Sequence, residues 1–514
     1  MQRCYTIILL IVFVFGISRA SAQNTNNPLL YSNQAVMFGD QVSPDDPVTI
    51  IMPGTAYAAG FGSFLDNPAS AALFDDSFGE FGLSYKMVNE DADYLGQSGS
   101  ADDMQGSVSN LGFVYRFPTT QGRFVIGGGY TQNAIHNRAL AFNARNDNST
   151  ITDNFKTPAS SYADIAYSTY ATDYGDEFED WDESILRLGF DEYGEYLGMR
   201  QQGEIFQRGF SGEYSLFFGT EFQENLMIGA SVGILNGRYR YDRIFQEIDE
   251  FNDYNSDFID SNNDGLGNTD VDNILLDDDL TSRYTGFRAR VGAIYRVTPF
   301  LNIGASHTLP TRISIEETFN AAIENTFDNG DVFEDLTESV FTYYVTNPSR
   351  TVLGLSLNDL AGVSVSLSAD YVDYSNTSID FDDSSLFEDE QIENDFIEET
   401  FRPVWSFRSG LAWEVGPDFT LRAGYGFLPS RFEGGTDDKS IYSLGMGFGL
   451  SNDIRFEVAT QYTRWDEVST VYEYGVYDYS PLDENPPTVS FQSEDAARTV
   501  DRFQVLATIR VNLY

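Results

Sequence analysis

The sequence FQVLATIRVNL, residues 503–513, decides the fold class. Its odd-numbered positions are all apolar, and its even-numbered positions are polar except for Leu506. A period of two places apolar side chains on one face of a strand and polar side chains on the other, which suits a wall between lipid and a wet lumen. The stretch therefore predicts one strand of an all-β protein, a transmembrane antiparallel β-barrel.

The same alternation recurs along the chain and predicts about fourteen strands. They are expected near residues 79–88, 107–117, 123–134, 209–219, 226–240, 284–297, 301–315, 348–357, 362–374, 403–414, 419–429, 440–450, 454–465 and 498–513. Some connections between them are short and the others are long. Outer-membrane barrels show this asymmetry, with tight periplasmic turns and long external loops.

The amino-terminus has the features of a secretory signal. Arg3 precedes an apolar run over residues 5–17, and Ala20-Ser21-Ala22 forms a small-residue cleavage pattern. We expect residues 1–22 to be a signal peptide and the protein to reside in a bacterial outer membrane. The only cysteine, Cys4, lies in this segment, so we expect neither a disulfide nor a lipid anchor in the exported chain.

Residues 23–77 precede the first expected strand. They mix Pro, Gly and Ala with apolar stretches such as Ile50-Ile51-Met52, which is more apolar than disorder favours. We expect this segment to be an amino-terminal hatch that plugs the lumen, with a disordered periplasmic leader as the alternative. Residues 78–514 then form the transmembrane barrel with long acidic external loops.

The charge distribution excludes one class of partner and leaves another open. The chain has 79 acidic and 30 basic residues and a formal net charge of −49. Nucleic acid is excluded, because binding phosphates requires the opposite sign. The acids are concentrated in segments 173–195, 247–279 and 380–399, between the expected strands. They form either a hydrated acidic surface or sites for divalent cations.

One acidic segment resembles a calcium-binding loop. Asp260, Asn262 and Asp264 place oxygen side chains at alternate positions before a glycine, and Asp270 follows. Hard oxygen donors with this spacing can surround one cation, but position twelve is Val271 rather than a bidentate Glu. No cofactor is required by the sequence, and calcium in this external loop is the one candidate, against a solvated acidic turn.

A family resemblance enters at GFGSFLDNPASAA, residues 60–72. Asn67, Pro68 and Ala69 follow a glycine-rich stretch shortly before the first expected strand, and the segment resembles the hatch of FadL-like outer-membrane transporters. Ser70 departs from the glycine that commonly continues the motif. The resemblance implies a fourteen-stranded barrel plugged by its amino-terminus, and passage of long-chain fatty acids or hydrocarbons.

The resemblance also implies a kink in the third strand that opens the wall sideways. The third expected strand contains Gly127, Gly128 and Gly129. Consecutive glycines readily form bulges, so this run is our candidate for the strand kink and lateral opening. The alternative is that the glycines only make room for a closely packed hatch.

Arginine side chains fall on the inward phase of several expected strands. The candidates for binding a ligand carboxylate are Arg288, Arg290, Arg408 and Arg422, and Arg455 and Arg510 share their phase. A buried guanidinium needs an anionic partner, and a carboxylate fits it best. The alternative is that these arginines form ion pairs inside the lumen with acids of the wall or of the hatch.

Catalysis has little support in the sequence. His136 and His307 are the only histidines, and no nucleophile-elbow, phosphate-loop or cysteine-pair motif occurs. We expect a non-enzymatic protein that lies among outer-membrane lipids and moves hydrophobic small molecules by passive diffusion through a plugged barrel. The alternatives are an assembly or secretion-shuttle component that holds protein partners at its external loops, and a general hydrophilic porin.

Overall fold

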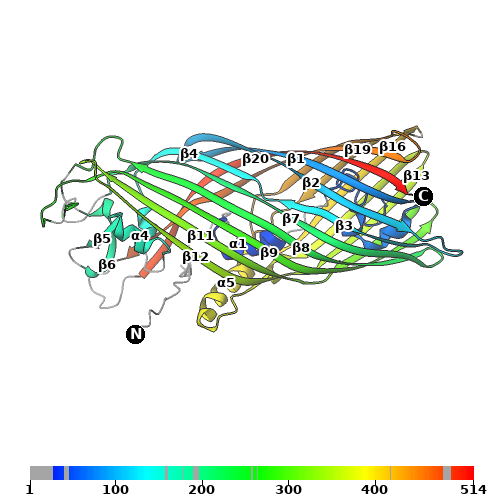
Figure 1. Ribbon diagram of the computed structural model, residues 1–514, viewed down its shortest axis with the longest axis horizontal. Helices are drawn as coiled ribbons and strands as arrows, with labels where there is room; N and C mark the ends of the chain where they lie inside the picture. Colours follow the sequence, from blue (N-terminus) through cyan, green and yellow to red (C-terminus); the bar gives the residue numbers. More distant parts are fainter. Residues whose placement is uncertain are drawn as a thin grey trace.

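The computed structural model describes residues 27–39, 45–58, 60–156, 160–175, 178–188, 196–255, 257, 259–262, 264–416, 418–478 and 488–513. The expected signal peptide lies outside these residues. The described chain forms a long, closed antiparallel barrel (Figure 1).

Eighteen strands form the barrel sheet of the described residues. They are β1 (Ser77–Tyr94), β2 (Gln97–Arg116), β3 (Phe124–Ile135), β4 (Arg138–Asn146), β7 (Met199–Gln223), β8 (Leu226–Ile248), β9 (Val271–Thr298), β10 (Leu301–Thr308), β11 (Thr311–Phe327), β12 (Val332–Asn347), β13 (Arg350–Leu360), β14 (Val363–Asp373), β15 (Ser378–Asp380), β16 (Pro403–Gly416), β17 (Phe419–Leu428), β18 (Lys439–Gly449), β19 (Ile454–Asp478) and β20 (Thr488–Leu513). Four crossings are each divided between two strands, namely β3 with β4, β10 with β11, β12 with β13, and β14 with β15. The wall therefore has fourteen crossings, which confirms the predicted fold class.

The first and last strands close the wall. β1 pairs with β20 in continuous antiparallel register from Ser77 opposite Leu513 to Tyr94 opposite Ala496. Closure gives the edge backbone groups partners that lipid cannot supply. The strand TVSFQSEDAARTVDRFQVLATIRVNL is thus longer than the stretch that predicted it.

Short helices and one small sheet complete the described chain. They are α1 (Tyr31–Gly39), α2 (Ser63–Asp66), η1 (Pro68–Leu73), α3 (Thr152–Phe155), α4 (Ala163–Ser168), η2 (Ile185–Arg187), η4 (Tyr374–Asn376), η5 (Ser384–Leu386), α5 (Phe387–Thr400), β5 (Thr172–Gly175) and β6 (Phe178–Ser184). No helix of the described residues is long and apolar enough to cross a membrane.

The two ends of the barrel differ in their connections. Leu513 lies at the end with short turns, and the segment that contains β5, β6 and α4 lies at the other end (Figure 1). Two connections at that outer end are tighter than predicted, because β1 continues into β2 through Leu95-Gly96 and β11 into β12 through residues 328–331. The alternation of burial persists there, but polar outward side chains replace apolar ones above the lipid.

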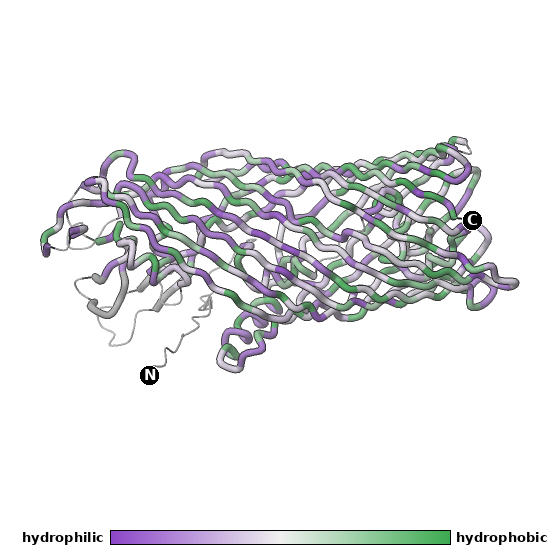
Figure 2. The backbone as a smooth tube through the Cα atoms, viewed as in Figure 1, coloured by the Kyte–Doolittle hydropathy of each residue, from purple (hydrophilic) through white to green (hydrophobic). Residues whose placement is uncertain are grey.

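The faces of the strands follow the predicted phase. In β14, Ser364, Ser366 and Ser368 are buried while Leu367 between them is exposed. In β20, the outward positions 503, 509, 511 and 513 carry exposed apolar side chains, and Figure 2 shows hydrophobic and hydrophilic positions alternating along the wall. A closed barrel with an apolar outer face belongs in a bacterial outer membrane.

The amino-terminal inner segment, residues 45–74, lies against the inner faces of the wall strands. Ser366 Oγ donates a hydrogen bond to the carbonyl of Pro53 at 2.7 Å, and Ser356 Oγ donates one to the carbonyl of Ala56 at 2.7 Å. Leu506, the exception in the alternation of β20, packs against Ile51 and other apolar residues of this segment. The exception is therefore explained by a contact inside the lumen.

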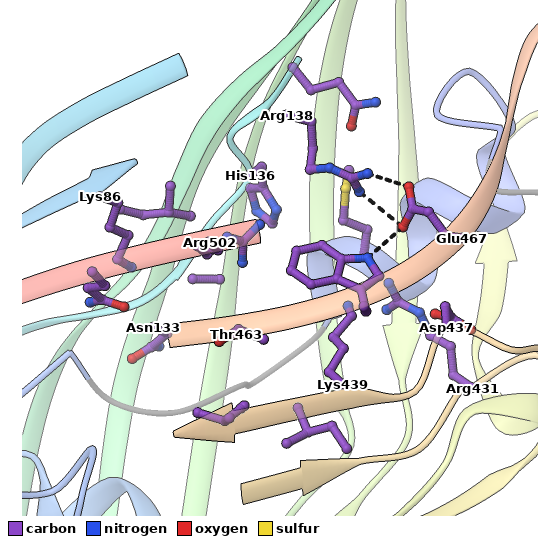
Figure 3. A pocket seen from close by; sticks show the side chains of 18 of the residues that line it. Lys86, Asn133, His136, Arg138, Arg431, Asp437, Lys439, Thr463, Glu467 and Arg502 are labelled. Atoms are coloured by element: carbon purple, nitrogen blue, oxygen red, sulfur yellow. Dashed lines mark hydrogen bonds and ion pairs between the residues drawn. The ribbon is translucent and has the colours of Figure 1, made fainter. Parts of the chain in front are cut away.

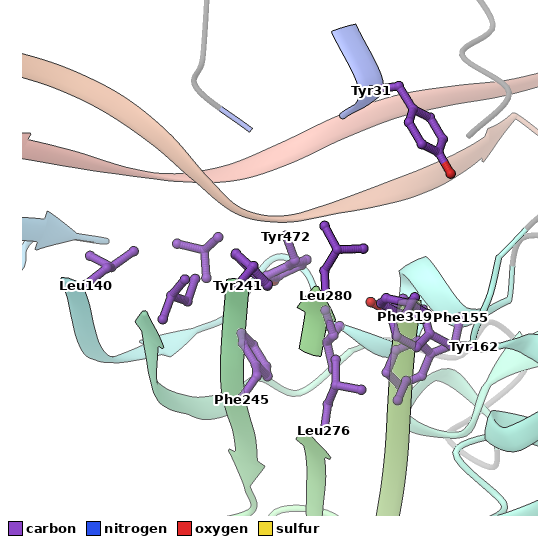
Figure 4. Packing of buried hydrophobic residues seen from close by; sticks show 14 of the residues in the cluster. Tyr31, Leu140, Phe155, Tyr162, Tyr241, Phe245, Leu276, Leu280, Phe319 and Tyr472 are labelled. Carbon is purple, nitrogen blue, oxygen red and sulfur yellow. The ribbon is translucent and has the colours of Figure 1, made fainter. Parts of the chain in front are cut away.

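An aromatic cluster fills the outer end of the barrel. Phe155 of α3 and Tyr162, which precedes α4, come from the loop 147–198 and are buried among wall residues such as Phe319 and Tyr241 (Figure 4). The rings of Tyr162 and Phe319 meet edge to face with centroids 5.8 Å apart. These two side chains of the loop thus pack into the lumen.

Candidate ligand-binding cavity

A cavity of about 150 Å³ lies between the inner segment, α1, the bend between β3 and β4, and the inner faces of β18, β19 and β20 (Figure 3). Its lining is amphipathic. Apolar side chains come from Met37, Ile50, Ile135, Leu428, Phe432 and Ile441. Such a mixture of apolar walls and a few charged groups is typical of small-molecule sites.

The charged part of the lining is dominated by cations. The basic residues are Lys86, Arg138, Arg431, Lys439 and Arg502, and the acidic ones are Asp45, Asp437 and Glu467. The whole chain has more than twice as many acids as bases, so this excess of bases at one place is specific to the cavity. The electrostatics of the cavity favour an anion.

Trp465 gathers three of these cations around its indole ring. The guanidinium of Arg502 lies 5.1 Å from the ring centroid, and that of Arg138 lies 5.4 Å away. The Lys439 ammonium lies 4.9 Å from the same centroid. Cation–π contacts of this length hold the positive groups at the cavity wall without neutralising them.

Arg502 differs from the other cations in its partners. Lys86 forms a buried ion pair with Asp45 at 2.7 Å. Within the described part of the chain, Arg502 forms no ion pair, and its Nη2 donates one long hydrogen bond, 3.5 Å, to the carbonyl of Asn137. Its guanidinium therefore keeps donors for a carboxylate that enters the cavity.

A four-charge cluster, Glu90, Arg138, Glu467 and Arg498, lies beside the cavity. The Arg138 Nε donates to Glu90 Oε1 at 2.7 Å, and its other nitrogens bind Glu467. Arg498 also binds Glu90, and all four side chains are at most one tenth exposed. The cluster holds β4 against β1, β19 and β20 on the inner side of the wall.

The position of β4 leaves a gap in the barrel ladder. β2 pairs with β3 only from Asn110 to Arg116, and no ladder joins its described residues 97–109 to β4. We call this gap the seam. The pairing of β3 with β7 shifts register between Gln132 and Ala134, just before the bend. At the outer end of the seam, Gly99 of β2 lies against the backbone of Ala141 of β4, so β4 lies on the lumenal side of β2 there.

Helix α1 is attached to the external helix α5. The backbone N–H of Ser32 donates to Glu393 Oε2 at 3.1 Å. Burial raises the pKa of Glu393 to about 7, so this carboxyl gains its charge near neutral pH. Asn33, Gln34 and Met37 of α1 line the cavity, so this contact positions part of its wall.

The hatch motif makes a capped turn inside the lumen. The Asn67 side chain accepts a hydrogen bond from the backbone N–H of Ala69 at 3.0 Å, and Pro68 occupies the first position of η1. The Asn67 Nδ2 donates to the carbonyls of Thr55 at 2.7 Å and Ala293 at 3.2 Å. The motif therefore joins two parts of the inner segment to β9.

The glycine run of β3 is paired on both sides. Residues 127–129 pair with residues 112–114 of β2 and 215–217 of β7 without a register shift. A side chain at Gly129 or at Gly112 would overlap the ring of Phe61 from the inner segment. The glycine run therefore lets the inner segment approach the wall closely. The β2–β3 ladder ends beyond the run, at Thr131 of β3. The predicted role of the three glycines in a lateral opening stays a prediction.

Each predicted arginine faces an acid of the protein. Arg290 Nη1 lies 2.7 Å from Glu213 Oε1, and Arg288 Nη1 lies 3.4 Å from Glu213 Oε2. Arg408 binds Asp66 of the inner segment at 2.6 Å. Arg422 binds Glu457 at 2.6 Å, and Arg455 and Arg510 pair with Glu457 and Glu80. Except for Arg455 and Glu457, which both lie on β19, these pairs join wall strands to each other or to the inner segment. None of these arginines lines the cavity.

In the candidate calcium loop, side-chain oxygens accept hydrogen bonds from backbone N–H groups of the same loop. Asp260 Oδ1 accepts the N–H of Asp264 at 3.0 Å, and Asn262 Oδ1 accepts the same N–H at 3.0 Å. Asp270 is buried, next to an isolated bridge between Ile259 and Thr269. Within the described residues, no group of three or more His, Cys, Asp or Glu side chains is arranged to hold a metal ion. Calcium binding here stays a prediction.

Each of the two histidines has a side-chain contact with a polar side chain of the wall. His136 lines the cavity, and its Nε2 lies 3.2 Å from the Tyr284 hydroxyl. His307 Nδ1 lies 3.0 Å from Thr351 Oγ1 on the neighbouring strand.

Sequence reasoning did not select the residues that line the cavity. They come from the inner segment, α1 and strands as far apart in sequence as β1, β3, β4, β7, β17, β18, β19 and β20, and only closure of the barrel brings them together. One signal was available, since Arg502 has the same even, inward phase in β20 as the selected Arg510. Lys439, Trp465 and Arg138 carried no such signal, because they lie at or beyond the ends of the expected strands.

Comparison with known proteins shows similarity at the level of the fold. No protein-family model and no curated protein matches the sequence. The crystal structure of the toluene transporter TodX from P. putida aligns with a TM-score of 0.50 and 12% identity, over 91% of this chain and 98% of TodX. A FadL homologue from Pseudomonas aeruginosa aligns with a TM-score of 0.49 and 13% identity, over 93% of this chain and 100% of that one. The resemblance to FadL-like transporters is thereby confirmed for the fold, on the TodX alignment.

Proposed function

We propose that this protein transports hydrophobic small molecules with an anionic head group, of the long-chain carboxylate class, across the outer membrane by passive diffusion. The observation that carries the proposal is the amphipathic cavity, in which Arg502 lies beside Trp465 without an acidic partner among the described residues. The barrel fold shared with a toluene transporter supports passage of hydrophobic compounds in general.

The cavity chemistry favours a carboxylate over a neutral hydrocarbon. An apolar chain gains free energy by leaving water for the side chains of Met37, Ile135 and Ile441. A carboxylate can accept charge-assisted hydrogen bonds from Arg502, whereas a neutral ligand would leave that guanidinium desolvated and unpaired. The free energy of binding should therefore depend on the head group as well as on the chain.

A direct route along the barrel axis is obstructed at both ends. The inner segment contacts the wall at the end with short turns, and the aromatic cluster fills the outer end. Passage then requires either movement of the inner segment or an exit through the wall. The seam beside the cavity is one part of the described wall where an exit would break no ladder hydrogen bonds.

The test compares a carboxylate with an uncharged ligand of the same chain length. The full chain is reconstituted in vesicles, and uptake of labelled oleate and oleyl alcohol is measured together with the part of the tryptophan quenching that is lost in Trp465→Phe, since the chain has four tryptophans. We expect Arg502→Gln to weaken oleate binding by roughly tenfold or more, since hydrogen bonds to charged groups contribute about 1.5–3 kcal/mol, and to leave the alcohol nearly unchanged.

A matched control is available on the outer face of the same strand pair. Arg464 is exposed and lies 3.7 Å from Asp501, so Arg464→Gln removes one positive charge without touching the cavity. This variant should bind oleate as the unaltered protein does. Equal losses in the two variants, or uptake no greater than in empty vesicles, would contradict the proposal.

A further inference from the structure

Four arginines form two like-charged pairs on the outer face of the barrel, and we call them the outer arginine patch. Arg208 of β7 is directly opposite Arg240 of β8. Arg238, also on β8, is directly opposite Arg283 of β9. All four side chains point outward and are exposed. Like charges at directly opposite positions destabilise a ladder, so an anion between them would stabilise this part of the wall.

The first pair has acidic partners but keeps donors on the surface. Arg208 Nη2 lies 2.9 Å from Asp103 Oδ1, and Arg240 Nη2 lies 2.6 Å from Asp242 Oδ1. Both arginine side chains are nevertheless about half exposed. A guanidinium has five N–H donors, so each of these ion pairs leaves donors that face outward.

The second pair has no close acidic partner. Arg283 Nη1 lies 3.9 Å from Glu316 Oε1, and the two side chains are 66% and 61% exposed. Ion pairs this long and this exposed contribute little. Within the described part of the chain, Arg238 forms no ion pair. Two neighbouring guanidinium groups therefore present donors to whatever surrounds the barrel.

A hollow of about 290 Å³ lies beside the patch on the outer face of the wall. Its lining includes the basic side chains of Arg208, Arg238 and Arg240 and the apolar side chains of Met104 and Phe210. Met104 is exposed, so the apolar part of the hollow is open to the surroundings as well. Such a lining suits a molecule with an anionic group next to an apolar chain.

The patch lies where the apolar outer face of the wall ends. On β8, the outward row passes from Ile234 to Arg238 and Arg240 in the direction of the long loops. On β9, it passes from Phe287 to Arg283 in the same direction. Lipid chains cover the apolar part of the wall, so the guanidinium groups lie among the lipid head groups of the outer leaflet.

Strands on another side of the barrel carry acids at the corresponding place. Beyond Met87, the outward row of β1 continues to Asp91 and Asp93. On β20, the outward position next to Phe503 is Asp501. An anionic lipid surface repels these acids and attracts the patch. The positive charge is thus local to β7, β8 and β9, in a chain with 79 acidic and 30 basic residues.

We propose that the outer arginine patch binds a phosphate group of an outer-leaflet lipid, and that the hollow receives the adjoining part of that lipid. Guanidinium groups bind phosphate through paired hydrogen bonds, and Arg238 and Arg283 have donors free for it. A phosphate at this place lies next to both like-charged pairs and offsets their repulsion. The site is on the outer face of the wall and is independent of the compound that the barrel transports.

The first experiment compares two forms of one lipid. The full chain in a mild detergent is mixed with lipid A, an acylated glucosamine disaccharide that carries phosphate groups, or with the same lipid after removal of its phosphates. Native mass spectrometry then measures the bound fraction. We expect the phosphorylated form to bind roughly tenfold more tightly, since hydrogen bonds to charged groups are the stronger ones. A chelator should not release it, because the contact needs no metal ion.

Two results of this comparison would overturn the inference. Equal binding of the two forms would mean that the phosphate is not recognised. Displacement of lipid A by inorganic phosphate at the same concentration would mean that the site takes free phosphate and not a lipid.

The second experiment locates the site with matched variants. We expect Arg238→Gln to weaken binding of phosphorylated lipid A roughly tenfold and to leave the dephosphorylated form unchanged. Arg464→Gln is the control, because Arg464 is an exposed arginine on β19 that lies 3.7 Å from Asp501. Without lipid, Arg238→Gln should unfold at a slightly higher temperature than the unaltered chain, since one like-charged pair is relieved. Equal losses of binding in the two variants would overturn the inference.

The third experiment places the lipid in the hollow. Cys4 is the only cysteine of the sequence, so Met104→Cys and Tyr442→Cys can each be labelled with a photoreactive maleimide after removal of the signal peptide. Both positions are exposed on the outer face, and Tyr442 lies on β18. In vesicles with a few lipid A molecules per barrel, we expect several-fold more cross-linking from position 104, and Arg238→Gln should abolish the difference. Equal cross-linking from both positions would overturn the assignment of the hollow.

Discussion

The two edges of β2 are held in different ways. Along β1, the ladder runs from Tyr94 opposite Gln97 to Phe78 opposite Val114, with one register shift. Along β3, it covers only Asn110–Arg116, and side chains make the remaining contacts. An unpaired edge within hydrocarbon would be costly. The comparison shows that polar side-chain contacts replace the ladder along part of the β3 edge of β2.

The cause of the difference lies on the neighbouring strand. β4 would continue the ladder with β2 if it followed the wall, but Arg138 turns inward to Glu90 and Glu467. The backbone N–H of Ala139 also donates to Glu90 Oε1 at 3.1 Å. Buried charges hold position strongly because leaving one unpaired is costly. The four-charge cluster therefore maintains the open edge.

The largest effect on stability is expected when one charge is removed from the four-charge cluster. Glu90→Gln keeps the side-chain volume but leaves Arg138 and Arg498 with Glu467 alone. Breaking a buried ion pair typically costs about 3–5 kcal/mol, and we expect a loss of that order in the free energy of unfolding in micelles. Hydrogen exchange should rise in β4 and remain slow along the β1–β20 ladder. The exposed pair of Arg312 and Asp380 gives the control, since Asp380→Asn should cost at most about 1 kcal/mol.

A smaller effect is expected where β4 passes behind β2. A Cβ at Gly99 would overlap the carbonyl oxygen of Ala141, so Gly99→Ala must push the strands apart. Overpacking of this kind costs about 1–3 kcal/mol, and we expect a loss of that order in the free energy of unfolding in micelles. Gly106→Ala is matched on the same strand, because its Cβ would meet only the Ser84 carbonyl at 3.9 Å. Equal thermal stability of the two variants would contradict the close contact at Gly99.

The sequence predicted the paired edge of β2 along β1, but it did not predict the unpaired part of the edge along β3 and β4. Every crossing of the wall was predicted, because lipid on one side and side chains on the other impose a period of two. The outer parts of the strands were missed, since residues 89–93 of β1 carry polar side chains outward once the wall leaves the lipid. Their inward alternation, with Glu90, Ala92 and Tyr94 buried, continues unchanged.

The candidate site shows the same limit. Paired arginines such as Arg408 and Arg422 stand out in sequence because they fall within strongly alternating strands. The cavity depends instead on where β4 bends, and that bend is fixed by Glu90 and Glu467, which lie far from Arg138 in the chain. Pairing over such separations leaves no local pattern in the sequence. The sequence therefore predicted the break in the wall at the glycine run and not at the bend between β3 and β4.

The smallest expected effect concerns a residue that contacts both edges. Ser107 Oγ lies 2.8 Å from Ser84 Oγ on β1 and donates to Gln132 Oε1 on β3 at 2.8 Å. Ser107→Ala removes both contacts, and a net loss of about 1 kcal/mol is expected for hydrogen bonds between neutral groups. Because the first edge keeps its ladder while the second has lost it above Asn110, hydrogen exchange should rise near Gln132 and not near Ser84. An equal rise on both sides would mean that side chains contribute as much to the paired edge as to the open one, and the contrast between them would then lie in the backbone alone.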